Sequence, residues 1–292
     1  MEYQAPRVSE MPRLSIVIVT YNSSHEIDAC LASLVADPPS MDHETLVVDN
    51  ASTDGTAATV RRRWPLVRVM DQDANIGFAA ASNVGIRQTR GELVLLLNPD
   101  TTVPAGAVDA LVASLDARPD AAVVGPRLVD AGGRAELSFG SMIGPLAELR
   151  QKLLVAGNRR GTPCIGPYVN HLTRRAREVD WVSGACLLVR RTDAEAAGWL
   201  DERYFMYAED VDFCAAIRAR GRRVLFAPDA EIVHLRGQSV ASMPHVVEAA
   251  YRRSQLAFYA KHHPRWVPVL RAYLKLRHRM ADPEIDPKAP HP

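Results

Sequence analysis

The sequence predicts an α/β fold built on a mostly parallel β-sheet with helices on both faces. Up to residue 125, short apolar runs alternate with segments of helical periodicity. Strands that read as continuous apolar runs are buried on both faces, and a single helix between successive strands makes them parallel. The predicted strands are residues 14–20, 45–49, 67–70, 92–97 and 121–125, and the predicted helices are residues 25–35, 56–64, 78–89 and 105–117.

The alternation breaks after Pro126. Residues 127–178 mix short strand signals with Gly, Pro and Arg, and they predict no regular element. Order returns with a predicted strand at 179–189, a helix at 208–220 and strands at 223–226 and 231–233. Residues 244–280 are predicted to be helical and basic, whereas residues 1–13 and the proline-rich tail over 281–292 are expected to be flexible or disordered.

Composition excludes several classes of protein. The chain has 292 residues with 47% hydrophobic and 24% charged residues, which suits a globular protein with a substantial core. A net charge of +1 does not favour a nucleic-acid partner. Three of the four cysteines lie in apolar or helical patterns and are expected to be buried thiols. Without a signal-peptide pattern or a membrane-spanning run, the expected location is cytoplasmic, either soluble or peripheral.

The run DERYFMYAEDVDF, residues 201–213, is the most informative stretch. Three carboxylates, Glu209, Asp210 and Asp212, follow directly after a group of aromatic residues. A helix start tolerates acidic residues because its first turn carries a partial positive charge. An apolar lead-in also places a carboxylate against a half-buried wall, where its pKa can be tuned for proton transfer. This run is therefore a candidate catalytic segment.

Two other polar positions end predicted strands. Asn98-Pro99-Asp100 follows the apolar run 93–97, and His234 follows the strand at 231–233. A carboxylate and an amide can hold a hard divalent cation by their oxygens, with diphosphate and water as further ligands. A polar turn explains the same spacing, and a lone histidine is more often structural. The position of His234 at a strand end, in step with the other sites, favours a metal or phosphate site.

Asp49 ends the second predicted strand, where ligands bind in open α/β sheets. A carboxylate there can accept a hydrogen bond from the ring N–H of a base or from a ribose hydroxyl. The following Ser52 to Gly55 are more typical of a turn and a helix cap. Asn75-Ile76-Gly77 opens the third predicted helix, where a bound phosphate and an asparagine cap are both compatible with the pattern. The chain has neither GxGxxG nor a P-loop motif.

The predicted C-terminal helices carry eight basic residues against one acid, Glu248, with aromatic and aliphatic residues between them. Basic amphipathic helices lie on anionic membranes. Packing of the segment onto the rest of the protein, with solvated charges, is the alternative. Arg252, Arg253 and Lys261 could instead contact the diphosphate of an acceptor. The basic residues are Arg252, Arg253, Lys261, Arg265, Arg271, Lys275, Arg277 and Arg279.

Six segments in order resemble inverting family 2 glycosyltransferases of the glycosyltransferase-A fold. They are LSIVIVTYN, VVDNASTDGT, NIGFAAASNVG, LLLNPD, WVSGACLLVRR and DERYFMYAEDVDFC, and the resemblance covers residues 14–240. The similarity is greatest to bacterial rhamnosyltransferases, including those that act on lipid-diphosphate-linked N-acetylglucosamine in cell-wall assembly. It implies a Rossmann-like sheet with a nucleotide-binding half over about 14–126, an acceptor half over 127–240 and a basic helical extension over 241–280.

The resemblance also implies roles for individual residues. Asp210, preceded by Glu209, matches the catalytic base, and Asp49 matches a residue that reads a pyrimidine. Asn98-Pro99-Asp100 replaces the Asp-x-Asp metal motif of the family, which leaves Asp100 and His234 as ligands of Mg²⁺ or Mn²⁺. The predicted donor-side residues are Thr20, Tyr21, Asn22, Asp49, Asn75, Gly77, Asn83, Asn98 and Asp100, and the predicted acceptor-side residues are Trp181, Ser183, Gly184, Arg252 and Arg253.

The predicted function is inverting transfer of L-rhamnose from dTDP-L-rhamnose to a lipid-linked or polymeric glycan acceptor at the inner face of the cell membrane. One alternative is the same scaffold with UDP-galactofuranose or a UDP-N-acetylhexosamine as donor. Another is a non-catalytic protein that binds nucleotide sugars or glycans. The presence of Asp210, Asp100 and His234 in one chain favours an enzyme.

Overall fold

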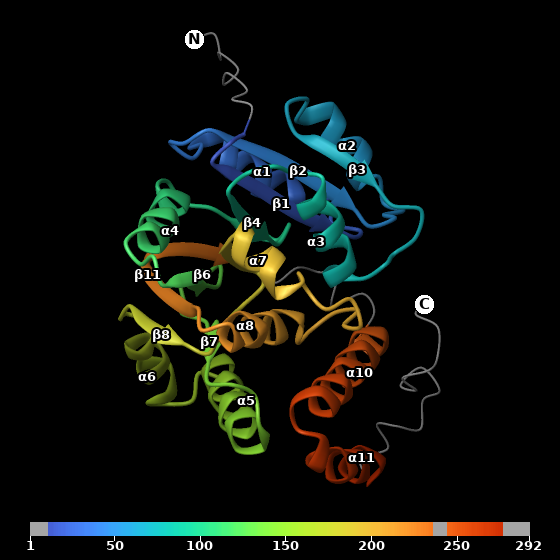
Figure 1. Ribbon diagram of the computed structural model, residues 1–292, viewed down its shortest axis with the longest axis vertical. Helices are drawn as coiled ribbons and strands as arrows, with labels where there is room; N and C mark the ends of the chain where they lie inside the picture. The colour runs from blue at the N-terminus through green and yellow to red at the C-terminus, as the bar shows by residue number, and fades with distance from the viewer. Residues whose placement is uncertain (1–10, 236–243, 277–292) are drawn as a thin grey trace.

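The computed structural model describes residues 11–235 and 244–276, and Figure 1 shows a layered α/β arrangement with further helices at its C-terminal end. The predictions for residues 1–10, for the tail and for Arg277 and Arg279 lie outside the described residues. The strands are β1 Leu14–Thr20, β2 His43–Asp49, β3 Arg68–Asp71, β4 Leu93–Leu97, β5 Thr101–Thr102, β6 Ala121–Val129, β7 Phe139–Gly140, β8 Arg177–Val179, β9 Trp181–Val182, β10 Cys186–Arg190 and β11 Arg223–His234. The helices are α1 Ile27–Ala36, α2 Thr56–Arg63, α3 Phe78–Arg87, α4 Ala107–Asp116, α5 Pro145–Arg159, α6 Ile165–Leu172, α7 Arg191–Ala197, α8 Glu209–Ala219, α10 Pro244–His262, the 3₁₀ helix η1 Pro264–Trp266 and α11 Val267–Leu276.

The main sheet confirms the predicted α/β fold. Its strand order is β3-β2-β1-β4-β10-β6-β11-β5, with β8 paired to β11. Strands β1 to β4 are mutually parallel, and β6 is parallel to β11. The side chains of β1 and β4 are buried along their whole length because helices cover both faces of the sheet. Leu31 of α1 and Leu111 of α4 pack on one face, while Ile86 of α3 and Phe213 of α8 pack on the other.

One strand of the main sheet runs antiparallel to both of its neighbours. The segment predicted as a single strand at 179–189 is divided into β8, β9 and β10, and β10 lies antiparallel between β4 and β6. Continuous apolar runs reveal that a strand is buried on both faces, but they do not reveal its direction. The antiparallel β10 joins the parallel half of the sheet to β6 and β11.

The segment without a predicted element is largely ordered. Strand β6 continues to Val129, the short strands β7 and β9 form a separate antiparallel pair, and α5 and α6 follow β7. The two strands predicted at 223–226 and 231–233 form one strand, β11, whose register with β6 shifts between Ala227 and Glu231. A β-bulge of this kind bends a strand without ending it.

Helix α10 lies beside the loop that leads into α8. Phe258 and Tyr259 of α10 pack with Tyr204 and Val211 in one buried cluster. Cys30, Cys186 and Cys214 are buried, as predicted. Within the described residues, no helix has the length and apolar character needed to cross a bilayer.

Two helical glycines predict opposite responses to substitution. A Cβ on Gly85 of α3 would collide with Val17 Cγ1 of β1, whereas one on Gly166 of α6 would make an ordinary 3.6 Å contact with Asn158 Oδ1. Overpacking a core costs about 1–3 kcal/mol, and alanine is favoured over glycine in helices by about 1 kcal/mol. We expect Gly85→Ala to lower the free energy of unfolding in urea and Gly166→Ala to keep or raise it. Equal stability of the two variants would contradict close packing of α3 on β1.

Candidate active site

Three predicted donor-side residues stand at the carboxyl ends of neighbouring strands. Thr20 ends β1, Asp49 ends β2 and Asn98 follows β4, and Thr20 lies opposite Asp49 in the register of β1 and β2. The carboxyl ends of parallel strands form the crevice in which open α/β sheets bind ligands. The structure therefore brings these residues to one edge of the sheet.

Asp49 is held in a fixed orientation. Its side chain is buried, Oδ1 accepts a hydrogen bond from the Thr20 hydroxyl at 3.1 Å, and Oδ2 accepts one from the backbone N–H of Ser52 at 3.0 Å. Each carboxylate oxygen can accept a second hydrogen bond. The carboxylate is thus oriented by the protein and can still accept a hydrogen bond from a ligand, as recognition of a base requires.

The loops after β1 and β2 are tied together. Asn22 has a left-handed backbone with φ of 51°. Its N–H donates to Ser52 Oγ at 2.9 Å, and its Oδ1 accepts from the N–H of Thr53 at 2.8 Å. Tyr21 precedes Asn22 and is half-buried. These bonds fix the rim of the edge where Asp49 lies.

Asn75, Gly77 and Asn83 support the loop that leads into α8. Asn75 Oδ1 accepts from the N–H of Gly77 at 3.0 Å, and a Cβ on Gly77 would lie 2.5 Å from the carbonyl oxygen of Phe205. Asn83 is buried and exchanges two hydrogen bonds with the backbone of Leu200, at 2.8 and 3.1 Å. Contact of these three residues with a donor stays a prediction, because the bonds observed here are structural.

Asp100 and His234 meet because β5 pairs with the end of β11. His234 lies opposite Thr101 in that register, and its Nε2 is 3.4 Å from Asp100 Oδ1. On the other side of the ring, Nδ1 lies 3.2 Å from Glu136 Oε2. Burial alone would lower the pKa of His234, but hydrogen bonds and charges from Asp100 and Glu136 outweigh it and raise the pKa to about 9.

This arrangement fits a cation that brings ligands of its own. Asp100 and His234 offer an oxygen and a nitrogen at one point, and a carboxylate on the far nitrogen is the usual support of a metal-binding histidine. Among the described residues, no group of three or more His, Cys, Asp or Glu side chains is arranged to hold a metal ion. A cation bound here would need diphosphate and water to complete its shell.

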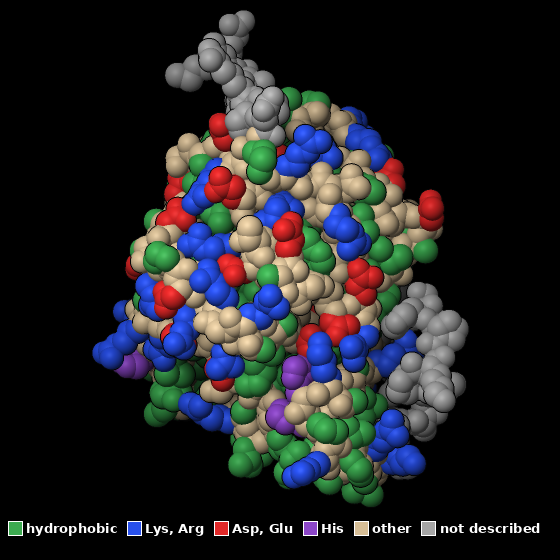
Figure 2. All heavy atoms as spheres, viewed as in Figure 1, with side chains coloured by type: hydrophobic (Ala, Val, Ile, Leu, Met, Phe, Trp, Pro, Cys, Tyr) green, Lys and Arg blue, Asp and Glu red, His purple; other side chains and the backbone are tan. Residues whose placement is uncertain are grey.

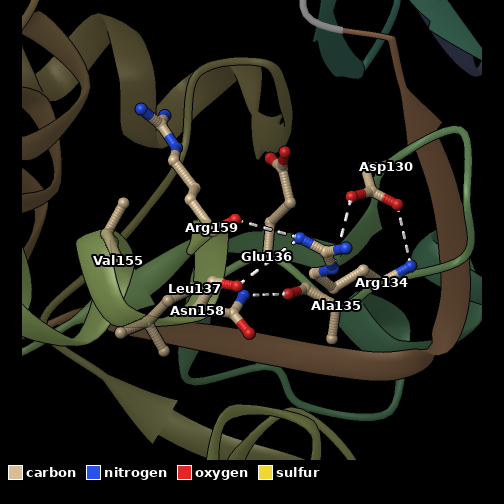
Figure 3. A pocket seen from close by; sticks show the side chains of 8 residues that line it. All are labelled: Asp130, Arg134, Ala135, Glu136, Leu137, Val155, Asn158 and Arg159. Atoms are coloured by element: carbon tan, nitrogen blue, oxygen red, sulfur yellow. Dashed lines mark hydrogen bonds and ion pairs between the residues drawn. The ribbon is translucent and has the colours of Figure 1, made fainter. Parts of the chain in front are cut away.

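Sequence reasoning missed Glu136. It lies in the segment without a predicted element, and it lines a cavity of about 210 Å³ beside the His234 pair. Figure 3 shows its side chain between those of Arg134 and Arg159. A single glutamate outside any periodic pattern carries no signal of this role in the sequence. Only the approach of the chain after β6 to the end of β11 reveals it.

Asp210 is the second residue of α8 and is held by two backbone N–H groups. Gly184 donates to Oδ2 at 2.9 Å, and Val211 donates to Oδ1 at 2.8 Å. Burial raises the pKa of Asp210, while these hydrogen bonds favour the ionised form and oppose the rise. The result is a fixed carboxylate that is more basic than an exposed aspartate.

Asp210 is linked to the sheet edge through Gly184. The next residue, Ala185, accepts a hydrogen bond on its carbonyl from the N–H of Asn98 at 2.9 Å. Asn98 is therefore joined to Ala185 by a backbone hydrogen bond, and Gly184, the residue before Ala185, is joined to the Asp210 carboxylate. This connection brings the predicted base and the predicted donor side together.

Glu209 differs from its neighbour in hydrogen bonding. It is buried, and its Oε2 has no hydrogen-bond partner among the described residues. Burial, and then the negative charge of Asp210, raise the pKa of Glu209 well above its usual range. The two N–H groups favour the ionised form of Asp210, whereas Glu209 Oε2 has no such partner, so Asp210 is the carboxylate that is available to accept a proton.

The backbone before α8 is strained. Tyr207 and Ala208 are consecutive non-glycine residues with left-handed backbones, with φ of 72° and 69°. Each such residue costs on the order of 1–3 kcal/mol, and such conformations cluster at functional sites. Two hydrogen bonds hold the loop in place, from the N–H of Phe78 to the Phe205 carbonyl at 2.7 Å and from Ser254 Oγ to the Met206 carbonyl at 2.7 Å.

Three predicted acceptor-side residues lie in or just after β9, which pairs with β7: Trp181 begins β9, and Ser183 and Gly184 follow it. Trp181 Nε1 donates to the carbonyl of Ser141 at 2.9 Å, and its ring lies against Gly140. The N–H of Ser183 donates to the carbonyl of Ser138 at 2.8 Å. These contacts fix the β7–β9 ribbon that leads to Gly184, while contact with an acceptor stays a prediction.

The basic residues predicted to meet an acceptor diphosphate are engaged within the protein. Arg252 is 9% exposed and donates to Gln255 Oε1 at 3.0 Å, and Arg253 is half-buried. Lys261 lies 2.7 Å from Asp212 Oδ2 in an ion pair. An acceptor would have to compete with these internal contacts.

Comparison with known proteins identifies the family. The family described as "Glycosyl transferase family 2" matches residues 15–194, which include β1 to β4, β10, Asp49 at the end of β2 and the loop that carries Asp100. The chain belongs to glycosyl transferase family 2. It is therefore a glycosyltransferase.

A relative of known name is similar over most of the chain. The N-acetylglucosaminyl-diphospho-decaprenol L-rhamnosyltransferase of Mycobacterium tuberculosis is 32% identical over 279 residues, covering 87% of this chain and 86% of that protein. Since the similarity extends beyond residue 194, it includes parts of the chain outside the family match.

Solved glycosyltransferases confirm the fold. The mannosyltransferase PcManGT from Pyrobaculum calidifontis, in complex with GDP-Man and Mn²⁺, aligns over 97% of this chain and 74% of its own, with a TM-score of 0.59 and 22% identity. GalNAc-T7 with UDP, GalNAc and Mn²⁺ aligns over 95% of this chain and 53% of its own, with a TM-score of 0.62 and 14% identity. The chain therefore has the glycosyltransferase-A fold.

The Glu209–Asp210 pair predicts an unequal response to amide substitution. Asp210→Asn removes the group that would accept the proton, so we expect turnover to fall by about 100- to 10,000-fold, with donor affinity little changed. Glu209→Gln replaces a carboxyl whose raised pKa already favours the neutral form, so we expect a much smaller loss. Turnover numbers for both variants, with folding checked by circular dichroism, measure the difference. Near wild-type turnover of Asp210→Asn would exclude Asp210 as the base.

Proposed function

We propose that the protein transfers L-rhamnose from dTDP-L-rhamnose, with inversion, to a hydroxyl of a lipid-linked or polymeric glycan acceptor. The observation that carries this proposal is the 32% identity, over 87% of the chain, with a relative named as an L-rhamnosyltransferase for N-acetylglucosaminyl-diphospho-decaprenol. A lipid-linked acceptor would place the reaction at the cytoplasmic face of the membrane. The nucleotide-binding half would span residues 14–126 and the acceptor half residues 127–240.

In the proposed reaction, Asp210 removes the proton from the acceptor hydroxyl. The hydroxyl oxygen forms a bond to the anomeric carbon as the bond from that carbon to the diphosphate breaks, and inversion follows from this single displacement. Gly184 and Val211 hold the Asp210 carboxylate through their N–H groups, so the base is oriented before the acceptor arrives. The hydrogen bonds to the Phe205 and Met206 carbonyls hold the strained Tyr207–Ala208 backbone, and with it the start of α8, in the same way.

Asp100 and His234 would hold a divalent cation, Mg²⁺ or Mn²⁺, against the donor diphosphate. When bound, the cation supplies Lewis-acid stabilisation of the negative charge that develops on the leaving nucleoside diphosphate. Glu136 would orient the His234 ring so that Nε2 faces Asp100. The cation would arrive with the nucleotide sugar, since the protein supplies only part of its shell.

Donors with uracil form the second candidate. A carboxylate that accepts the ring N–H of a pyrimidine does not distinguish thymine from uracil, so Asp49 is equally compatible with UDP-galactofuranose or a UDP-N-acetylhexosamine. Transfer assays with a panel of nucleotide sugars test the proposal directly. Transfer from dTDP-L-rhamnose supports the proposal, and preferential transfer from a UDP-sugar would show that the donor is that UDP-sugar. Binding of donors without transfer or hydrolysis would indicate a non-catalytic protein.

The metal assignment predicts that nucleotide binding and transfer both depend on the metal. We expect EDTA to abolish transfer and Mn²⁺ or Mg²⁺ to restore it. Asp100→Ala should weaken dTDP binding only when the metal is present, and Glu136→Gln should weaken the same metal-dependent binding by about 10- to 100-fold. Isothermal titration with dTDP, with and without Mn²⁺, measures both effects. Glu178→Gln is the matched control, because Glu178 pairs with Arg223 on the surface.

Full activity after exhaustive chelation would refute the metal assignment. Nucleotide binding that is independent of Mn²⁺ in the wild-type protein would refute it as well. In either case, basic side chains or a helix terminus would have to neutralise the diphosphate.

The orientation of Asp49 predicts selectivity among nucleoside diphosphates. An imino N–H is present in thymine and uracil, is absent from cytosine and is differently placed in purines. We expect dTDP and UDP, in the presence of Mn²⁺, to raise the melting temperature of the protein more than CDP, GDP or ADP. Asp49→Asn should remove the preference. Equal stabilisation by GDP would contradict a pyrimidine site at Asp49.

A further inference from the structure

Helix α5 exposes a row of leucines to solvent. Leu146, Leu149 and Leu153 are 83%, 55% and 62% exposed. Their spacing of three and four residues places them on one face of the helix. The opposite side of α5 faces the protein, where the Gln151 amide donates to the carbonyl oxygens of Leu137 and Phe139 at 3.4 Å and the Asn158 amide donates to that of Ala135 at 2.9 Å. A stripe of exposed leucines has no function in the internal packing of the fold.

Helix α11 exposes a second apolar row. Val269, Tyr273 and Leu276 are 56%, 48% and 82% exposed, and their spacing of four and three residues again defines one face. Trp266, in η1 just before α11, is 48% exposed, whereas Leu274 is fully buried. The buried residue shows that α11 packs on the protein by its other face.

The two helices belong to one region of the molecule. His263, just before η1, lies 2.6 Å from the carbonyl oxygen of Ile143, just before α5. Val267 of α11 packs in the same cluster as Ile143. Figure 1 places α5 and α11 at the same end of the molecule, and in Figure 2 hydrophobic side chains gather at that end with Lys and Arg side chains among them.

The charges on this region have one sign. The acid in α5, Glu148, has a side chain only 12% exposed and accepts hydrogen bonds from Gln255 and Tyr259 of α10. Neither η1 nor α11 contains an acidic residue. Lys152 is paired with Glu148 at 2.5 Å. The other exposed charged residues of α5, η1 and α11 are all basic, and they are Arg150, Arg159, Arg265, Arg271 and Lys275.

We propose that α5, η1 and α11 form a surface that inserts its exposed apolar side chains into an anionic lipid bilayer, with the basic residues at the level of the headgroups. Apolar side chains with basic neighbours are the features of helices that lie in a membrane interface. The biological role of this surface rests on the proposed function, because a lipid-linked acceptor resides in a bilayer. We call α5, η1 and α11 together the lipid-facing surface.

This surface differs from the one predicted from the sequence. Of the eight basic residues predicted there, Arg252 is buried and Lys261 is paired with Asp212, so α10 does not present them. The lipid-facing surface takes its other half from α5, in the segment for which the sequence predicted no element. The surface therefore combines apolar insertion with electrostatic attraction. Salt separates the two contributions to binding, because it screens the charges and leaves the apolar contribution in place.

Two pairs of variants test the surface in flotation assays with phosphatidylglycerol and phosphatidylcholine vesicles. Leu149→Gln with Leu153→Gln removes part of the apolar row, and Leu66→Gln is the control, because Leu66 is 66% exposed at the opposite end, between α2 and β3. Arg271→Gln with Lys275→Gln removes two basic residues, and Arg62→Gln with Arg90→Gln is the charge-matched control on the nucleotide-binding half.

We expect wild-type protein to float with phosphatidylglycerol vesicles at low salt and to be only partly released at high salt. The leucine variant should lose at least about tenfold in partition coefficient at both salt concentrations, while the Leu66 control should not change. The basic variant should lose about tenfold or more at low salt alone, because each charge near an anionic surface contributes about 1 kcal/mol.

Four results would overturn the assignment of this surface. The first is that the wild-type protein does not bind phosphatidylglycerol vesicles at low salt. The second is that the leucine variant binds as well as the wild type, and the third is that the Leu66 control loses as much binding as the leucine variant. The fourth is a stable dimer in analytical ultracentrifugation that the leucine variant abolishes.

Transfer to a water-soluble acceptor is measured in parallel. All four variants should retain it, so loss of vesicle binding with intact transfer separates this surface from the proposed function. Vesicle binding by a wild-type protein that transfers no sugar would leave the surface standing and refute the proposed function.

Discussion

The position of β10 is the constraint on which the rest of the molecule depends. This strand pairs antiparallel with β4 on one side and with β6 on the other, so it joins the parallel β1–β4 half to β6 and β11. The residues just before it, Gly184 and Ala185, consequently lie at the carboxyl end of β4 and bond to Asp210 and Asn98. If β10 were parallel, its other end would lie there, and Asp210 would lose the N–H group that orients it.

The chain beyond β10 stabilises the strained loop before α8. Two consecutive left-handed residues are unfavourable by themselves, so other contacts must hold them. Asp212 supplies the central contact, because its buried carboxylate accepts from the Tyr204 hydroxyl at 3.2 Å and pairs with Lys261 and His262 of α10 at 2.7 and 2.6 Å. A buried carboxylate is tolerated only when it is paired in this way. Helix α10 is thus part of the structure that positions the candidate base.

The sequence predicted the elements whose pattern is local and missed what depends on long-range pairing. The strands β1, β2 and β4 were predicted because their apolar runs are buried on both faces, and the polar residues after them fell at the sheet edge as expected. The direction of β10 depends on its partners, which no local pattern encodes. Helix α5 was missed because its leucines lie on an exposed face, so the usual division into a buried apolar side and an exposed polar side is absent.

Glu136 illustrates the same limit within the candidate site. Asp100 and His234 could be selected because each follows an apolar strand, but Glu136 lies in a short connection after β6. Its contact with His234 depends on β11 being parallel to β6, which brings the end of β11 to the end of β6. A residue that supports a ligand, and does not itself follow a strand pattern, is found only when the sheet is assembled.

Helix α10 connects the candidate base to the lipid-facing surface by direct side-chain contacts. At one set of positions, Lys261 and His262 bind Asp212 of α8. At another, Gln255 and Tyr259 bind Glu148 of α5, whose exposed face carries the leucines. Because both carboxylates are largely buried and each has several partners, neither contact can be exchanged easily for water. A bilayer bound to α5 would therefore hold α8, and Asp210 with it, at a fixed orientation to the membrane. An acceptor whose lipid is anchored in that bilayer would then meet the base from one direction, which is the condition for a single in-line displacement.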